Sequence, residues 1–161
     1  MASVVSLKTQ AGPVPSPQEL VDRARAMIPT LKSRARQCVK NFNVSEETIA
    51  EMKEAGFFRI LQPKRWGGYE MHPNVFFDVQ KLLAEGCMST GWMYGVVGCH
   101  PYELALFHDQ AQREVWGDDS SMLVASTYQP VNQASCRGRR TSRRIPWSVS
   151  NRRPGQLGQW R

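Results

Sequence analysis

The sequence lacks any long hydrophobic run. No stretch of about 18 apolar residues, the length that a membrane-spanning helix needs, occurs anywhere in the 161 residues. Residues 1–17 contain one lysine and no apolar core, so they also lack the pattern of a secretory signal peptide. These absences predict a cytoplasmic protein that does not insert into a membrane.

Motifs for metal binding and for nucleophilic catalysis are also lacking. The four cysteines, Cys38, Cys87, Cys99 and Cys136, form no C-x-x-C pair, and no histidine follows them at zinc-finger spacing. The sequence contains no H-E-x-x-H motif, no nucleophile elbow and no paired metal carboxylates. We therefore expect reduced thiols and no metal ion.

Acidic residues and lysine are absent from residues 132–161, which contain eight arginines. The rest of the chain is near neutral, with 13 basic and 14 acidic residues. Such a composition is typical of a G+C-rich gene read out of frame, and the lack of helical or strand periodicity favours this interpretation. The alternative is a genuine basic tail that binds nucleic acid or another anion. The favoured interpretation predicts a disordered tail and no nucleic-acid partner.

Strong helix signals begin at residue 16. Ser16 can cap a helix, Pro17 suits the first helical position, and Glu19 completes a capping box. Apolar residues then recur at helical spacing as far as residue 35. Pro29 lies within this pattern and should kink the helix or split it in two.

Two more helices are predicted on either side of a short apolar segment. Ser45, followed by two glutamates, marks the start of one helix, and Gly56 marks its end. Residues 57–68 are apolar and then broken by proline and glycine, which favours an extended stretch followed by a turn. A helix with one apolar face should run from Pro73 to Gly86.

The segment after Gly86 has a different character. Residues 88–99 place small and aromatic residues on every side of a helix, a pattern typical of a buried helix. Pro101 should end this helix, and two short helices are expected at residues 103–107 and 109–116. Residues 122–127 form the first convincing strand signal.

Two long segments are similar to a known family. GFFRILQPKRWGG (residues 56–68) and STGWMYGVVGCHPYELALFHDQAQREVWGDD (residues 89–119) resemble the oxygenase components of two-component flavin-dependent aromatic hydroxylases. The 4-hydroxyphenylacetate and secosteroid phenol hydroxylases are of this type. The resemblance covers residues 17–130 and is specific because both motifs are long.

The resemblance implies the acyl-CoA dehydrogenase fold, in which a helical domain, a β-domain and a four-helix bundle follow one another. Family members are more than twice as long as this chain. The expected fold is therefore mainly α: a flexible N-terminus at residues 1–16, the N-terminal helical domain at 17–119, only the beginning of the β-domain at 120–131, and a disordered tail at 132–161.

The resemblance also implies a reaction. A separate NAD(P)H-dependent flavin reductase supplies reduced flavin (FMNH2 or FADH2), which reacts with molecular oxygen to give a flavin hydroperoxide. An electron-rich ring then accepts the distal oxygen, so the expected activity is a monooxygenase that hydroxylates a phenol or indole, in the latter case leading to pigment. Members of the family form homotetramers.

Two residues match catalytic positions of the family. The resemblance implies that His100 contacts the substrate hydroxyl, since a neutral imidazole can accept a phenol or N–H proton. It implies that Ser126 contacts substrate or flavin, since a hydroxyl can donate to a peroxide or phenolate oxygen. The alternatives are a His100 that only satisfies a backbone carbonyl and an ordinary strand serine.

Two aromatic residues are expected to bind the substrate ring. Trp92 and Tyr128 would give it flat apolar walls, although core packing is the alternative role for Trp92. His72 and His108 are expected at the surface beside helix ends, with no chemistry. Two other functions remain open: a small basic nucleic-acid-binding protein, or an inactive fragment without a complete flavin site.

Overall fold

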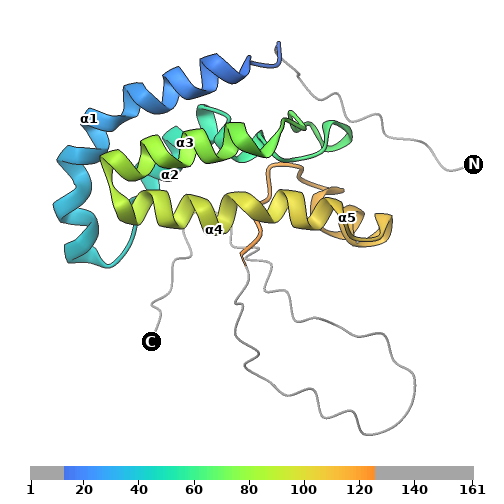
Figure 1. Ribbon diagram of the computed structural model, residues 1–161. Helices are drawn as coiled ribbons and strands as arrows, with labels where there is room; N and C mark the ends of the chain where they lie inside the picture. Colours follow the sequence, from blue (N-terminus) through green and yellow to red (C-terminus); the bar gives the residue numbers. More distant parts are fainter. Residues whose placement is uncertain (1–12, 126–161) are drawn as a thin grey trace, which may run out of the picture.

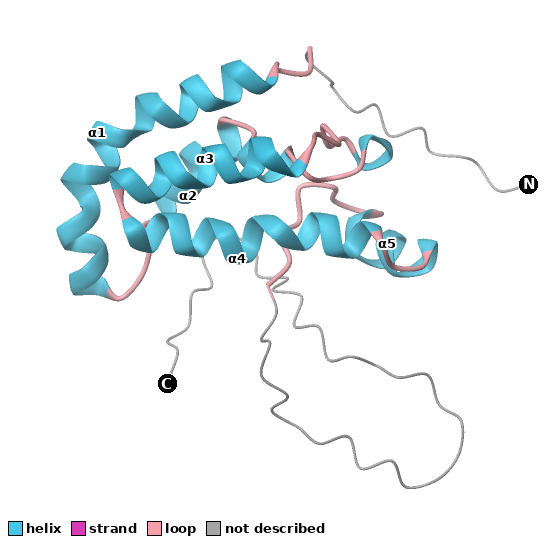
Figure 2. Ribbon diagram, viewed as in Figure 1, coloured by secondary structure: helices cyan, strands magenta, loops and turns pink. Residues whose placement is uncertain are grey.

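The computed structural model describes residues 13–125, which form a mainly helical domain. Its elements are α1 (Pro17–Asn41), α2 (Glu46–Glu54), η1 (Phe57–Arg59), η2 (Lys64–Trp66), α3 (Pro73–Gly86), α4 (Met88–Ala105) and α5 (Asp109–Trp116). Figure 1 shows α3 lying between α1 and α4, with α2 behind them and α5 at the far end of α4. The predicted mainly α fold is confirmed (Figure 2).

The helix starts follow the local signals in the sequence. The Ser16 hydroxyl accepts a hydrogen bond from the Glu19 amide at 3.2 Å, and the Glu19 carboxylate accepts one from the Ser16 amide at 2.5 Å. The Ser45 hydroxyl caps α2 by accepting from the Thr48 amide at 3.3 Å. Both predicted caps are therefore confirmed, and each satisfies a helical N–H that has no partner within its own helix.

Pro29 bends α1 without splitting it. The helix is continuous from Pro17 to Asn41, and Figure 1 shows it changing direction about halfway along. Proline lacks the amide hydrogen that would bond to the preceding turn, which accounts for the bend. Of the two outcomes expected at Pro29, the kink is the one observed.

The prediction of an extended segment at residues 57–68 was wrong. The chain instead makes two short 3-10 turns, η1 and η2, with Gly56 and Gly67 in the left-handed region at φ 85° and 79°. Backbone hydrogen bonds from Tyr69 to Arg59 (2.8 Å) and from Met71 to Ile60 (2.9 Å) fold the segment back on itself. These contacts and the burial of its apolar residues stabilise the compact form.

The predicted end of α4 at Pro101 was also wrong, because the helix continues to Ala105. The separate short helix expected at 103–107 is therefore not present, and its first three residues belong to α4. His100, Pro101 and Leu104 are all buried, so tertiary packing outweighs the hydrogen bond that Pro101 cannot make. The short helix expected at residues 109–116 is confirmed as α5.

The expected strand falls partly outside the described residues. Residues 122–125 have irregular backbone, and Val124 packs against Leu104 and Trp116 in a small apolar cluster. Residues 126–127, the end of the predicted strand, lie outside the described part. So do most of the predicted flexible N-terminus and the whole predicted tail at 132–161.

The main core lies between α1, α3 and α4. Tyr94 of α4 is at its centre with 0% exposure, and its hydroxyl donates to the Phe57 carbonyl oxygen at 3.1 Å. Its ring packs against three phenylalanines with centroid separations of 4.8–6.3 Å. The other fully enclosed members of the core are Leu20, Ala24, Val79, Leu83, Met52 and Ile60.

The close approach of α3 and α4 depends on Gly91. A Cβ atom there would lie 2.5 Å from the Ala84 Cβ and 2.8 Å from the Ala84 backbone nitrogen, so α3 would have to move. A Cβ at Gly95 would meet the end of the flexible Gln80 side chain, which can rotate away. Alanine substitutions at these two positions of the same helix can therefore be compared, because only the one at Gly91 would push α3 away.

We expect Gly91→Ala to lower the free energy of unfolding by about 1–3 kcal/mol, because it overpacks a helix contact. Gly95→Ala should change it by less than about 1 kcal/mol, because alanine's higher helix propensity offsets the displaced amide. Urea denaturation followed by circular dichroism measures both. Equal losses in the two variants would show that Gly91 does not set the helix spacing.

Candidate functional site

His100 lies on α4 with only 1% of its surface exposed. Its Nδ1 lies 2.8 Å from Oε2 of Glu103, one helical turn further along. The helix places both side chains on one face because residues at positions i and i+3 are neighbours there. The buried imidazole is thus oriented by a carboxylate that is itself half-buried.

The carboxylate selects one form of the imidazole. When the Glu103 carboxylate is ionised it can only accept a hydrogen bond, and the His100 Nδ1 is then the donor in this pair. In a neutral ring with its hydrogen on Nδ1, the lone pair is on Nε2. The pair has the arrangement of a general base and its orienting group.

A groove with aromatic walls runs beside this pair between α3 and α4. Its volume is about 470 Å³, within the range of sites for small molecules. Phe77 of α3 and Trp92 of α4 line it and are 54% and 74% exposed. Glu103 also lines the groove, so one carboxylate connects the groove with the buried His100.

Of the predicted site residues that the structure describes, only one lines this groove. Trp92 lines the groove and is not part of the core, so core packing was the wrong alternative for it. Its exposure also contradicts the expectation that the segment 88–99 is buried on every side. His100 is eight residues further on, about 12 Å along the helix axis, and faces inward. Ser126 and Tyr128 lie outside the described residues.

Sequence reasoning missed Glu103. The H-x-x-E spacing from His100 was visible, but Pro101 was expected to end the helix and so to separate the two residues. The exposed Phe77, which also lines the groove, was not singled out in the sequence either. The continuation of α4 through Pro101 is what brings His100 and Glu103 together.

His72 and His108 are both exposed beside helix ends, as predicted. Each caps a helix: the His72 Nδ1 accepts from the Asn74 amide at 3.2 Å, and the His108 Nδ1 accepts from the Gln110 amide at 3.3 Å. Their side chains therefore have a structural role at the starts of α3 and α5.

The groove fits a flat aromatic ring better than it fits a whole flavin. Its lining is apolar and aromatic apart from Gln80 and Glu103, and it includes no lysine or arginine. A flavin nucleotide carries phosphate, which proteins usually bind with cations or helix N-termini. The shape and lining of the groove therefore suit a flat apolar ring, and the described residues that line it include no cation that would bind a phosphate.

Cys99, His100 and Glu103 place three possible metal-ligand atoms within 4.8 Å of one another. The His100–Glu103 contact at 2.8 Å has the length of a hydrogen bond and leaves no room for an ion between these two atoms. That the chain holds no metal stays a prediction.

Within residues 13–125, none of the helices has the length and apolar character needed to cross a membrane.

Comparison with known proteins places this domain in a family. The family model for the acyl-CoA dehydrogenase N-terminal domain matches residues 15–119. The chain belongs to this family.

Individual similar proteins indicate a narrower group within this family. The oxygenase subunit HsaA of a flavin-dependent monooxygenase from Rhodococcus jostii (strain RHA1) is 39% identical over 111 residues, which make up 69% of this chain and 29% of that protein. A pigment production hydroxylase from Rhodococcus erythropolis is 35% identical over 112 residues, 70% of this chain and 28% of the hydroxylase.

A solved structure agrees with these relatives. The crystal structure of 3-HSA hydroxylase from Rhodococcus sp. RHA1 matches with a TM-score of 0.68 and 39% identity, over 70% of this chain and 29% of that one. The resemblance to oxygenase components of flavin-dependent hydroxylases is thereby confirmed. The chain spans less than a third of the length of these relatives.

Proposed function

We propose that this chain provides the helical domain of an oxygenase component that hydroxylates an aromatic compound with reduced flavin and molecular oxygen. The observation that carries the proposal is the buried His100–Glu103 pair beside an aromatic groove. The sequence identity of 39% to the oxygenase subunit HsaA of a flavin-dependent monooxygenase supports it. The proposed partners are an NAD(P)H-dependent flavin reductase and further copies of the oxygenase, in the cytoplasm.

The proposed roles follow from the chemistry of each side chain. Reduced flavin, FMNH2 or FADH2, would supply the electrons that activate oxygen. Trp92 would provide a flat wall for the substrate ring, and His100 would accept the proton of a phenol O–H or indole N–H. Removing that proton makes the ring more electron-rich and therefore more reactive toward an electrophilic oxygen. Ser126 and Tyr128 are proposed to complete the site.

A hybrid enzyme tests the proposal. Residues 15–125 of this chain would replace the matched segment of the Rhodococcus jostii HsaA subunit, which supplies the remaining length. We expect the hybrid, combined with a flavin reductase and NADH, to hydroxylate a simple phenol, with the product detected by mass spectrometry. A hybrid that folds and assembles like the parent but forms no product from any phenol would contradict the proposal.

Indole should also be a substrate of the hybrid. Its nitrogen donates electron density to the third ring carbon, which can then accept an electrophilic oxygen without a phenol group. It is flat, and the wall formed by Trp92 suits such a ring. The relative from Rhodococcus erythropolis is named a pigment production hydroxylase, which supports this expectation.

We therefore expect cells that produce the hybrid and a flavin reductase to form a blue pigment when fed tryptophan or indole, because the hydroxylated product oxidises in air to indigo. Absorbance of the extracted pigment measures the outcome, and cells with the reductase alone are the control. Phenol hydroxylation without any indigo would exclude indole while leaving the proposed function intact.

A further inference from the structure

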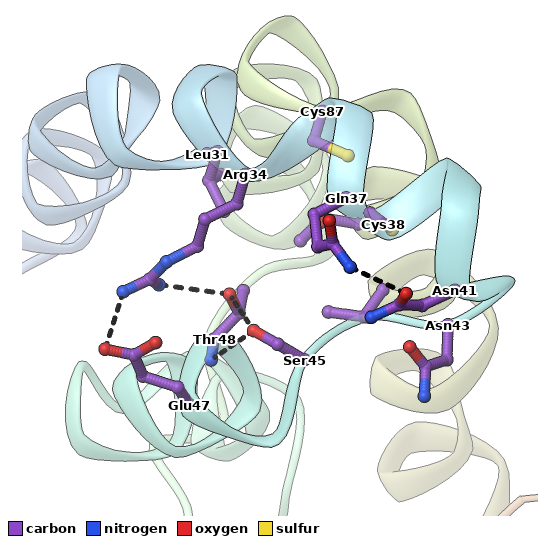
Figure 3. A pocket seen from close by; sticks show the side chains of 12 residues that line it. Leu31, Arg34, Gln37, Cys38, Asn41, Asn43, Ser45, Glu47, Thr48 and Cys87 are labelled. Carbon is purple, nitrogen blue, oxygen red and sulfur yellow. Dashed lines mark hydrogen bonds and ion pairs between the residues drawn. The ribbon is translucent and has the colours of Figure 1, made fainter.

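Two cysteines meet at a small pocket near the start of α4. Cys38 near the end of α1 and Cys87 directly before α4 both line a pocket of about 180 Å³. Figure 3 shows the two side chains beside each other, although 49 positions separate them in the sequence. Both are free thiols in the structure.

The surroundings make the two thiols unequal. Burial raises the pKa of Cys87, but hydrogen bonds from the Thr90 side chain and backbone, with smaller contributions from Cys38 and the Ser89 amide, outweigh burial and lower it. Burial and the neighbouring Cys87 raise the pKa of Cys38. Cys87 is therefore the thiol that ionises first, at the positive N-terminal end of the 18-residue helix α4.

We propose that Cys38 and Cys87 form a reversible intramolecular disulfide when the protein meets hydrogen peroxide. The proposal rests on the thiol pair and is independent of the proposed function. Neither residue contributes to the groove or to the His100–Glu103 pair.

The chemistry takes place in two balanced steps. The Cys87 thiolate attacks one peroxide oxygen, the O–O bond breaks, and Cys87 becomes a sulfenic acid. The hydroxide that leaves takes up the proton that the Cys87 thiol released on ionising, which gives the first water. The Cys38 thiol then attacks the Cys87 sulfur, the S–O bond breaks, and water leaves with the Cys38 proton. Two thiols are oxidised to one disulfide while one peroxide is reduced to two waters.

The pocket suits this reaction in two respects. Its volume of about 180 Å³ is well above the roughly 10–15 Å³ that a cavity needs to hold one water molecule, so there is room for a peroxide molecule. Cys38 is half-buried and Cys87 is 6% exposed, and both residues line the pocket that a peroxide molecule would enter. Cys99 has a different environment, since its thiol lies 3.2 Å from the Val96 carbonyl oxygen on its own helix.

The experiment uses the whole 161-residue chain. Reduced protein is treated with hydrogen peroxide, catalase removes the excess, remaining thiols are alkylated, and tryptic peptides are identified by mass spectrometry. We expect residues 37–40 to be joined to residues 82–113, and dithiothreitol to separate them. Because the second peptide also contains Cys99, a Cys99→Ser variant is the matched control and should keep the cross-link.

Cys38→Ser and Cys87→Ser should each abolish the cross-link. Circular dichroism checks that each variant folds. If Cys87→Ser, which alters the more buried cysteine, does not fold, the result with Cys38→Ser decides whether the cross-link needs this pair. Three results would overturn the proposal. The first is the absence of the cross-link in the unaltered chain, also when Cys87 is oxidised alone to a sulfinic acid. The others are a cross-link that persists in Cys87→Ser and disulfides that join two copies of the chain.

Discussion

His100→Ala in the hybrid enzyme is expected to lower the rate of aromatic hydroxylation by about 100-fold or more, the usual contribution of a positioned acid–base group. Alanine removes the imidazole to which we assign the substrate proton, and it removes the 2.8 Å contact with the Glu103 carboxylate. Consumption of reduced flavin by oxygen should change little, because His100 is assigned to the substrate. NADH would then be oxidised without an equal amount of product.

The ratio of product formed to NADH consumed is the decisive measurement. His108→Ala is the matched control, because His108 is an exposed helix cap with no assigned chemistry. Glu103→Gln should have an intermediate effect of about 10-fold, as expected when a group that orients a histidine is weakened. If His100→Ala slowed flavin oxidation and hydroxylation equally, the assignment of His100 to the substrate would be refuted.

Tyr94→Ala is expected to lower the free energy of unfolding of the chain by about 3–5 kcal/mol, as for other large aromatic residues removed from a core. The ring is fully buried and contacts Phe57, Phe58 and Phe76, so its removal leaves a cavity where η1, α3 and α4 meet. Since small domains have about 5–15 kcal/mol in total, a large fraction of the stability would be lost.

A conservative variant separates the ring from its hydroxyl. Burial raises the pKa of Tyr94, so the hydroxyl stays protonated and donates to the Phe57 carbonyl. Tyr94→Phe removes only this hydrogen bond and should lower the free energy of unfolding by about 1–3 kcal/mol. Tyr102→Ala, at a half-exposed position of the same helix, should have an effect of less than about 1 kcal/mol.

Urea denaturation monitored by circular dichroism gives all three values. Similar losses for Tyr94→Ala and Tyr102→Ala would contradict the packing described for α4. A Tyr94→Phe variant as unstable as Tyr94→Ala would instead assign most of the effect to the hydrogen bond with Phe57.

Local signals predicted most helix boundaries. The start of α1 and the start of α2 depend on serine caps that act within four residues, and Pro73 and Gly86 mark the observed ends of α3. Such signals can be read from the sequence because both partners of each contact are neighbours in the chain. The aromatic residue at 92 and the histidine at 100 could be singled out only by resemblance to a family.

The sequence by itself determined the mainly α fold, the helix caps and the bend at Pro29, since these follow from backbone geometry and contacts within one helical turn. Only the tertiary structure decided that α4 continues through Pro101, because that requires burial against other helices to outweigh a missing hydrogen bond. This continuation joins Glu103 to His100. Packing of α1 against α3 likewise brings Cys38 to Cys87, which lies between α3 and α4, and no spacing in the sequence encodes this proximity.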